Sequence, residues 1–378
     1  MRKLKLGVVG LGRAFALTAP TLAADSRVRI TGVTDPRPEA MAQAERDFGA
    51  KGFPSLETLL KGDIEAVYVA TPHQFHAEHA RLAAAAGKHV LVEKPMALSI
   101  DECRAMADAA RAGGVCLVVG PSHSFDLPIK KTKQLIASGR YGRVRMMTAL
   151  NFTDFLYRPR RPEELATALL NQSAHHVDIA RLLAGTRLES VRAQTVAWDR
   201  GEGAYSALLR FEDSFATLVY SGNAHFDSDE FMGWIGELGQ KKDPSRYGAA
   251  RKALAGRDEL NFKNSRNYGG AEFKPGEAQF HEHFGPIIVS CEKADLRPLP
   301  TGVMVHADGE QRLEAMPFAR EPGAAVIDEL YDAIATGKPA LHDAAWGLAT
   351  TEACLAILES AKSGKEIPLK HQTSASRI

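Results

Sequence analysis

The chain has 378 residues, which is more than a single hydrophobic core usually supports, so two domains are expected. Its 45% hydrophobic and 25% charged residues are ordinary for a globular protein, and its formal net charge is only +1 at pH 7. Such a small charge creates no general attraction for nucleic acid or an anionic membrane. No segment offers the roughly eighteen uninterrupted apolar residues of a membrane span. We expect a small-molecule partner, with neither nucleic acid nor a membrane.

The four cysteines lie far apart and form no Cys-x-x-Cys pair: Cys103, Cys116, Cys291 and Cys354. This usage favours free thiols in a reducing compartment, and hence a cytoplasmic protein. Arg2, Lys3 and Lys5 before an apolar run imitate a signal peptide, but Arg13 and three glycines interrupt that run. A strand fits this segment better.

The first fifteen residues indicate a strand, a tight turn and a helix. Leu4 to Val9 form a short apolar run, Gly10 and Gly12 follow, and an Ala-rich segment begins at Ala14. Glycine lets backbone N–H groups and the positive end of a helix approach a pyrophosphate closely. The pattern therefore predicts a dinucleotide-binding turn, although Phe15 occupies the third position of the fingerprint, where Gly or Ala is usual.

An acidic residue follows the second predicted strand, where the fingerprint expects one. Val28 to Thr34 form that strand, and Asp35 comes directly after it, suited to binding the adenosine ribose hydroxyls. Asp35 disfavours a 2′-phosphate whereas Arg13 and Arg37 would accept one, so we expect NAD and leave NADP open. The alternative is a tight turn of another α/β protein in which Asp35 caps the next helix.

Up to about residue 122, apolar strands keep alternating with helices. Further strands are predicted at 64–70, 89–93 and 115–120, with helices at 36–48, 75–86 and 100–112. This alternation predicts a parallel sheet covered on both faces, with ligands beyond the carboxyl ends of its strands. Those ends carry Gly10 to Gly12, Asp35, Thr71 to His73, Glu93 to Pro95 and Gly120 to His123.

Beyond Phe125 the pattern changes to long alternating segments, which are typical of antiparallel strands. They lie at 144–152, 191–198, 205–211 and 215–221, with a hairpin turn at Glu212 and Asp213. Helices at 128–138 and 173–183 accompany them, and strands return at 287–290 and 303–306. An open sheet needs a cover on its second face, so we expect a homo-oligomer, a dimer or tetramer, formed through this sheet.

The fold class predicted is α/β, with an N-terminal Rossmann domain at 1–123 and an α+β domain with a largely antiparallel open sheet at 124–370. Residues 226–280 form a polar, locally basic insertion, interpreted as a lid, a subunit contact or a merely solvated loop. Helices at 324–335 and 344–361 close the fold, and a flexible tail is expected at 371–378.

A lysine stands at the carboxyl edge of the predicted parallel sheet. Lys94, in Glu93-Lys94-Pro95, comes directly after a strand. Partial burial beside a cationic nicotinamide would disfavour its ammonium form, so this amine would exchange protons near neutral pH. The alternative is an ordinary surface lysine.

Four features together resemble the Gfo/Idh/MocA family of NAD(P)-dependent oxidoreductases: Gly-Leu-Gly at 10–12, Thr-Pro-His-Gln-Phe-His at 71–76, Glu-Lys-Pro at 93–95 and His175-x-x-Asp178. The similarity spans nearly the whole chain, and Glu-Lys-Pro is its most specific element. It implies that Lys94 lies beside the nicotinamide and the reacting hydroxyl, and that His175 faces it from the second domain. Lys94 and His175 are then the catalytic residues, while Asp178 orients His175 or caps structure.

The resemblance also implies which residues contact the ligands. Cofactor contacts are expected from Gly10, Gly12, Arg13, Ala14, Phe15, Asp35, Arg37, Thr71, Pro72, His73, His76, Glu93 and Lys94. Substrate contacts are expected from His123, Arg158, Arg160, Arg161, Asn171 and His175. Two positions depart from the family pattern: Asn171 replaces an acid four residues before His175, and His73 replaces an Asn. A glycine-rich turn ahead of Asn171 is missing too, so an Asp–His–Lys relay is not expected.

Three histidines at helical spacing raise the question of a metal. His73, His76 and His79 spread too far around a helix to close on one ion easily, and no cysteine or carboxylate cluster completes a shell. We therefore expect no metal.

Three arginines follow Tyr157: Arg158, Arg160 and Arg161. A planar guanidinium binds a carboxylate through two hydrogen bonds, so paired arginines suit a dicarboxylate, with an exposed basic loop as the alternative. Four stretches together resemble the phthalate dihydrodiol dehydrogenase branch of the family: Gly-Leu-Gly-Arg-Ala-Phe, Pro-His-Gln-Phe-His-Ala-Glu-His, Tyr-Arg-Pro-Arg-Arg-Pro-Glu-Glu-Leu and His-Phe-Asp-Ser-Asp-Glu.

We therefore expect an NAD(P)-dependent dehydrogenase that oxidises a secondary alcohol by hydride transfer, with the cis-dihydrodiol of a phthalate-like carboxylate as substrate. His175 would remove the hydroxyl proton, Lys94 would steady the alkoxide, and the arginines would hold carboxylates. A sugar or inositol dehydrogenase of the same family is one alternative. A non-catalytic NAD(P)-binding sensor or scaffold is another, because Asn171 and the missing glycines alter the catalytic pattern.

Overall fold

The computed structural model covers residues 1–378, and the described part comprises residues 3–165, 168–246, 248–274, 277–318 and 323–375. The chain divides into two compact units. Unit 1 comprises Met1–Pro121, Leu260–Gly276 and Gly323–Thr351, and unit 2 comprises Ser122–Glu259, Glu277–Pro322 and Glu352–Ile378. Residues 260–276 and 323–351 thus cluster with the N-terminal part of the chain, whereas the sequence pattern assigned them to the second domain.

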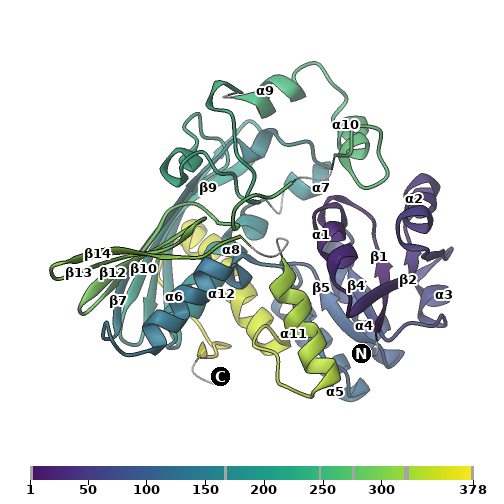
Figure 1. Ribbon diagram of the computed structural model, residues 1–378, viewed down its shortest axis with the longest axis horizontal. Helices are drawn as coiled ribbons and strands as arrows, with labels where there is room; N and C mark the ends of the chain where they lie inside the picture. The colour runs from purple at the N-terminus through teal and green to yellow at the C-terminus, as the bar shows by residue number, and fades with distance from the viewer. Residues whose placement is uncertain (1–2, 166–167, 247, 275–276, 319–322, 376–378) are drawn as a thin grey trace. The chain divides into compact units, whose positions relative to one another are not determined.

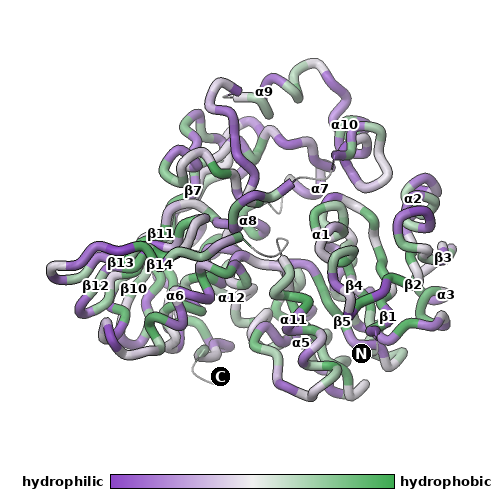
Figure 2. The backbone as a smooth tube through the Cα atoms, in the orientation of Figure 1, coloured by the Kyte–Doolittle hydropathy of each residue, from purple (hydrophilic) through white to green (hydrophobic). Residues whose placement is uncertain are grey.

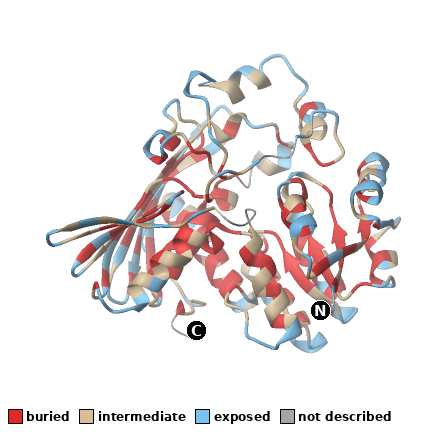
Figure 3. Cartoon of the chain, in the orientation of Figure 1, coloured by how far each residue is buried: buried red, intermediate tan, exposed pale blue. Residues whose placement is uncertain are grey.

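A six-stranded parallel sheet forms the centre of unit 1, in the order β3-β2-β1-β4-β5-β6 (Figure 1). Its strands are β1 (Leu4–Val9), β2 (Val28–Thr34), β3 (Lys51–Gly52), β4 (Ala66–Val69), β5 (His89–Val92) and β6 (Leu117–Val119). The central strands are apolar. Their red colour in Figure 3 marks them as buried, because helices cover the sheet on both sides. The predicted parallel sheet is confirmed, and only the two-residue β3 was not anticipated.

Helices cover both faces of this sheet. On one face, Val67 of β4 joins an apolar cluster with Met106 of α5 (Ile100–Gly113) and residues of α4 (His76–Ala85). On the other face, Tyr68 Oη lies 3.1 Å from Thr18 Oγ1 of α1 (Arg13–Ala24). The other helical elements of unit 1 are α2 (Pro38–Phe48), α3 (Leu56–Leu60), η1 (His73–Phe75), α11 (Ala324–Ala335) and the start of α12 (Ala344–Ser363). The tube of α2 carries many hydrophilic residues in Figure 2, and this helix buries only Ala40 and Ala44.

A segment distant in sequence completes the core of unit 1. After α10 (Glu259–Arg266), Tyr268 packs edge-on against Phe15, with ring centroids 4.9 Å apart, and its hydroxyl donates a hydrogen bond to Asp47. Phe15 is fully buried. The aromatic residue at the third fingerprint position therefore fills a core that Tyr268 completes.

Unit 2 is built on a nine-stranded sheet in the order β14-β13-β12-β11-β7-β10-β9-β8-β15. All neighbours are antiparallel except β7 and β10, so the largely antiparallel sheet is confirmed. The strands are β7 (Val144–Phe152), β8 (Leu188–Trp198), β9 (Gly201–Phe211), β10 (Phe215–Ser221), β11 (Ile287–Cys291), β12 (Ala294–Leu299), β13 (Gly302–Ala307), β14 (Glu310–Ala315) and β15 (Ile367–Pro368). Strands β12, β14 and β15 were not predicted. β12 contains Pro298, which disfavours a strand, β14 has charged residues at alternate positions, and β15 has only two residues.

The helices α6 (Leu127–Ala137) and α8 (Ala168–Ala184) pack on one face of this sheet. The other helical elements are short: η2 (His123–Phe125), η3 (Phe155–Tyr157), α7 (Pro162–Leu165), η4 (Ser228–Met232), η5 (Pro244–Arg246) and α9 (Ala249–Leu254). The last three lie within the predicted 226–280 insertion, which therefore contains regular turns and helices as well as loop.

Described residues of the predicted flexible tail are held by hydrogen bonds within unit 2. The backbone N–H of His371 donates to Glu352 Oε2 at 2.9 Å, and Arg181 Nη2 donates to Thr373 Oγ1 at 3.1 Å. Residues 371–375 are thus anchored, and residues 376–378 lie outside the described part. Among the described helices, none combines the length and apolar character that a bilayer crossing demands.

Candidate active site

The turn after β1 has the backbone that a dinucleotide requires. Gly10 has φ +89°, and a Cβ there would lie 2.7 Å from the carbonyl oxygen of Ala70, so only glycine fits. Gly12 begins α1 without a side-chain cap from any described residue, and a Cβ there would meet no atom within 4 Å. The start of α1 therefore has room for a phosphate to approach closely.

Asp35 and Arg37 brace this turn from the end of β2. The Asp35 carboxylate accepts hydrogen bonds from the Leu11 N–H at 2.7 Å and from Arg37 Nε at 3.0 Å. Arg37 in turn donates to the carbonyl oxygens of Leu11 and Tyr268, at 2.6 and 3.2 Å. Both side chains thus fix the loop beside the place where the adenosine ribose is expected, and Arg37 is already engaged by Asp35.

His76 joins the loops that follow β4 and β5. Its Nδ1 lies 2.9 Å from the carbonyl oxygen of Pro95, and its Nε2 lies 2.9 Å from that of Thr71. Burial lowers the pKa of His76 to about 4, despite the two carbonyl groups that favour its charged form. The neutral ring has one N–H and can donate to only one of these oxygens at a time. His76 therefore supports the Lys94 loop from the interior.

Glu93 is a buried acid with one well-placed partner. Tyr68 Oη donates to Glu93 Oε1 at 2.6 Å, and burial raises the pKa of this carboxyl to about 7, although the neighbouring Lys94 and Tyr68 oppose the shift. Lys94, the next residue, is only half-buried. The sequence thus places an amine at the sheet edge directly beside an acid that titrates near neutrality.

The remaining predicted cofactor residues lie at the same carboxyl edge of unit 1. Arg13 and Ala14 open α1, with Arg13 exposed, while Thr71 and Pro72 follow β4. Burial lowers the pKa of His73 well below its usual value, and the charges of His76, Lys94 and Lys263 add to this effect. The glycine turn and the uncapped helix start fit a dinucleotide held by residues of this edge, and their individual contacts with it stay predictions.

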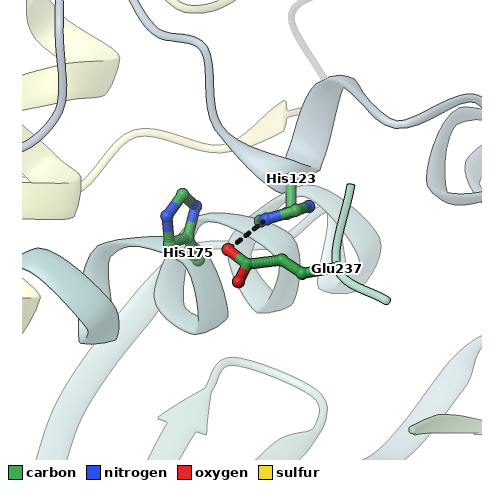
Figure 4. Close-up of side chains that lie close together, drawn as sticks. All are labelled: His123, His175 and Glu237. Carbon is green, nitrogen blue, oxygen red and sulfur yellow. Dashed lines mark hydrogen bonds and ion pairs between the residues drawn. The ribbon is translucent and has the colours of Figure 1, made fainter. Parts of the chain in front are cut away.

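In unit 2, the structure brings together His123, His175 and Glu237, whose candidate metal-binding atoms all lie within 4.8 Å of one another (Figure 4). His123 comes from η2, His175 from α8, and Glu237 from the loop after η4. His123 Nε2 is 3.4 Å from Glu237 Oε1, and the two imidazole centroids are 4.6 Å apart. Two predicted substrate residues therefore meet an acid that the sequence did not single out.

Asp126 holds the other side of the His123 ring. His123 Nδ1 lies 2.8 Å from Asp126 Oδ2, and both side chains are almost completely buried. Burial alone would lower the pKa of His123, but the carboxylates of Asp126 and Glu237 outweigh it and raise the pKa to about 10. Burial is the main influence on Asp126 and raises the pKa of its carboxyl. His123 is therefore flanked by acids on both ring nitrogens.

Asp178 and Asn171 take different places on α8. Ser124 Oγ donates to Asp178 Oδ2 at 2.5 Å, so Asp178 ties η2, which carries His123, to the helix that carries His175. Asn171 lies one helical turn before His175, and its Oδ1 accepts a hydrogen bond from Gln172 Nε2 at 2.6 Å. Asp178 thus connects η2 to α8, and its expected role in orienting His175 stays a prediction.

Arg160 is a buried guanidinium without an acidic partner among the described residues. It donates to the carbonyl oxygen of Phe155, and its Cζ lies 4.1 Å from the centroid of that ring. Its Nε and Nη1 are buried without a hydrogen-bond partner in the described part, as is the hydroxyl of Tyr220. Burial lowers the pKa of Arg160 to about 10. Unsatisfied buried donors of this kind are costly, which makes them candidates for binding an anion.

The two other predicted arginines are placed differently. Arg158 is exposed and donates to Glu237 Oε2 at 3.4 Å, so it is linked to the His123 cluster. The backbone N–H of Arg161 donates to Glu164 Oε2 at 3.4 Å. Of these three arginines, Arg160 is therefore the one with buried donors that lack a partner in the described part.

The sequence did not single out Glu237, Asp126 or Tyr220 as site residues. Asp126 had a signal, because it stands three residues after His123 at a predicted strand end. Glu237 lies in a polar insertion with many other charges, and Tyr220 lies in an apolar strand. Neither has a local pattern that would separate it from its neighbours.

Two family descriptions match the chain. Residues 4–121 match the Gfo/Idh/MocA description "Oxidoreductase family, NAD-binding Rossmann fold", and residues 129–240 match "GFO/IDH/MocA C-terminal domain". Among relatives, the 1-carboxy-3-chloro-3,4-dihydroxycyclohexa-1,5-diene dehydrogenase of Comamonas testosteroni is 45% identical over 377 residues, covering 95% of each chain. Inositol 2-dehydrogenase 2 of Saccharopolyspora erythraea is 30% identical, over 51% of this chain and 57% of its own.

The structural comparison gives the same grouping. A protein of Bordetella bronchiseptica RB50, named as a candidate dehydrogenase, superposes with a TM-score of 0.91 at 40% identity, covering 97% of this chain and 100% of its own. The likeness therefore extends over both units, and not only over the cofactor-binding part.

Proposed function

The chain belongs to the Gfo/Idh/MocA family of NAD-binding oxidoreductases, and from that premise we propose that it oxidises the cis-dihydrodiol of a ring carboxylate. The observation that carries this proposal is its 45% identity, over 95% of each chain, to a dehydrogenase whose name describes a carboxylated dihydroxycyclohexadiene. The inositol and levoglucosan dehydrogenases among its relatives match in sequence over 51% and 52% of this chain.

The unit 2 arginines support a carboxylated substrate. The Nε and Nη1 groups of Arg160 are buried without partners in the described part, and a carboxylate is a strong, charge-assisted acceptor for a guanidinium N–H of this kind. The Tyr220 hydroxyl is a further buried donor. An uncharged polyol would supply weaker acceptors to Arg160, so this residue favours the acid over the sugar alternative.

In the proposed reaction, His175 accepts the proton of the substrate hydroxyl, and Lys94 stabilises the oxygen as negative charge develops on it. NAD, when bound at the carboxyl edge of unit 1, supplies the acceptor for the hydride that leaves the carbinol carbon. The resulting ring ketone tautomerises to a catechol, and the recovered aromaticity favours oxidation. The buried imidazole of His76 and the Glu93–Tyr68 pair hold the Lys94 loop in place.

An absorbance assay tests this function directly. The purified chain is mixed with NAD or NADP and either cis-dihydrodiol carboxylates, the matching diols without a carboxylate, or inositols and sugars. We expect NAD reduction with the carboxylated diols at a kcat/KM at least about 100-fold above that with the other alcohols. Preference for inositols or sugars would favour the second function, and cofactor binding without turnover of any alcohol would indicate a sensor.

We also propose that the chain forms a homo-oligomer through the open face of the unit 2 sheet. The pairing register puts Met146 beside Phe215, and Leu208, Thr217, Thr148 and Ile288 in one row on the same face. The four apolar members, Met146, Phe215, Leu208 and Ile288, are each about 40% exposed or more, and buried neighbours alternate with them along each strand.

The sheet-face proposal predicts that Phe215→Asp lowers the molar mass in solution, measured by light scattering, towards that of one chain. Leu82→Asp, on an exposed position of α4 in unit 1, is the matched control and should leave the mass unchanged. A wild-type chain that is already monomeric at micromolar concentration would contradict the proposal.

The four free cysteines, none in a disulfide, support our further proposal of a cytoplasmic location.

A further inference from the structure

We infer that His123, His175 and Glu237 bind one divalent transition-metal ion of the zinc class. Two imidazoles and one carboxylate form the donor set of known zinc and non-haem iron sites. One candidate donor atom from each residue lies within 4.8 Å of the others. Sequence spacing predicted no metal because the donors come from three separate segments, and only the fold of unit 2 brings them together.

The donor spacing suits such an ion. With metal–ligand bonds of about 2.0–2.1 Å, neighbouring donors of a tetrahedral site lie about 3.4 Å apart. His123 Nε2 and Glu237 Oε1 already have a separation of 3.4 Å. The donor of His175 needs a shift of no more than roughly 1 to 2 Å, within reach of a side-chain rotation, to complete the triangle. Figure 4 shows the Glu237 carboxylate directed between the two imidazole rings.

Asp126 supplies the outer partner that metal-binding histidines usually have. An N–H at His123 Nδ1 donated to Asp126, at 2.8 Å, orients the ring so that Nε2 faces Glu237. In the metal-free chain, the proton on Nε2 lies between the ring and the Glu237 carboxylate. A divalent ion would displace that proton and use both groups as ligands.

The surroundings hold the three donors in place. Arg158 contacts Glu237 Oε2 at 3.4 Å, on the other carboxylate oxygen from the one that faces His123, and its charge offsets part of that of the acid. Phe284 packs against both imidazoles, with centroid distances of 5.1 Å to His123 and 4.7 Å to His175. An apolar wall of this kind limits solvent access to a metal.

Occupancy would add a Lewis acid to the substrate side. Three protein ligands leave a coordination position open, as in catalytic zinc sites, and a hydroxyl bound there would have a lowered pKa. His175 would then act as a ligand instead of a proton acceptor. Metal binding goes beyond the proposed function and does not depend on the substrate, so it is tested by binding and not by turnover.

The test is a titration of the chelator-treated full chain with Co²⁺, whose visible absorption reports its ligands, followed by displacement with Zn²⁺. We expect one equivalent to bind. His123→Gln and Glu237→Gln should each weaken binding by more than about 100-fold, and Asp126→Asn by about 10-fold. His306→Gln, on β13 and outside the cluster, is the matched histidine control and should bind as the wild type does. Circular dichroism checks that each variant folds.

Absence of a Co²⁺ band from the wild type would overturn the site, and this result needs no variant. Equal Co²⁺ affinity of the wild type and folded Glu237→Gln would overturn it too, and would leave His123 and Glu237 as a hydrogen-bonded pair. Turnover bears only on the proposed function. A chain that binds Co²⁺ with this ligand dependence but oxidises no diol carboxylate retains the site and loses that function.

Discussion

The carboxyl edge of unit 1 and the polar cluster of unit 2 are held in different ways. In unit 1, polar groups bond to groups on neighbouring strands and loops, as Asp35 does with Leu11 and Glu93 with Tyr68. In unit 2, His123, Arg160 and Tyr220 come from separate segments, and Arg160 and Tyr220 keep buried donors without partners in the described part. The hydrogen-bonded edge of unit 1 suits a cofactor shared across a family. The buried Arg160 and Tyr220 donors of unit 2 can still hydrogen-bond a particular substrate.

The largest expected effect tests whether the edge of unit 1 carries chemistry as well as cofactor binding. Lys94→Ala should lower kcat by about 100- to 10,000-fold, because the variant lacks the amine that stabilises the developing alkoxide. NAD binding, followed by calorimetry, should stay measurable. Lys61→Ala, at an exposed position after α3, is the control for loss of a lysine. Retained turnover in Lys94→Ala would remove this residue from the mechanism.

The next expected effect is on the stability of unit 1. Glu93 is hydrogen-bonded to Tyr68, but its burial still disfavours the ionised carboxylate. Its pKa is about 7 in the folded chain, so the native state holds an extra proton between the unfolded value near 4.5 and pH 7. Stability from the protonated acid is thus fully present below about pH 4.5 and is lost as pH rises through 7. The loss amounts to roughly 3 kcal/mol.

Glu93→Gln should escape this loss because its side chain is neutral at every pH. Urea unfolding at pH 5 and pH 8 should show the free energy of unfolding of the variant rising relative to wild type between the two. Glu78→Gln, on an exposed position of α4, should show no such change. Parallel pH dependences for wild type and Glu93→Gln would mean that Glu93 is ionised in the folded chain throughout.

The smallest expected effect tests the buried guanidinium donors of Arg160 in unit 2. Arg160→Gln should raise KM for a carboxylated diol by about 10- to 100-fold, since a hydrogen-bonded charge contributes about 1.5–3 kcal/mol. KM for the matching diol without a carboxylate should change far less. Arg192→Gln, on an exposed position of β8, controls for the change in net charge. Equal effects on both diols would show that Arg160 acts on the fold and not on the carboxylate.

The sequence predicted unit 1 better than unit 2 for a physical reason. A buried parallel strand is a continuous apolar run followed closely by its functional residues. Gly10, Asp35 and Lys94 could therefore be recognised from the sequence, because each closely follows such a run. In the antiparallel sheet, β14 alternates partly buried charged residues with exposed residues, and its sequence resembles a loop. The strand pattern alone therefore left gaps in the second sheet.

The unit 2 cluster shows where local patterns stop being informative. His175 entered the prediction through a family resemblance and Arg160 through its basic neighbours, whereas Glu237 lies 62 positions beyond His175 in a charged insertion. Its proximity to His123 results from the path of the 226–280 segment, which no short motif encodes. Tertiary contacts between distant segments of this kind require the folded chain.

The chain passes from one compact unit to the other five times, after residues 121, 259, 276, 322 and 351. No single proteolytic cut or stop codon can release unit 1 whole, because a fragment ending near residue 121 lacks Tyr268, against which Phe15 packs. Such a fragment would expose aromatic surface and tend to aggregate. Chimaeras that exchange substrate specificity between relatives should therefore transplant loops of unit 2 individually instead of joining halves at one crossover point.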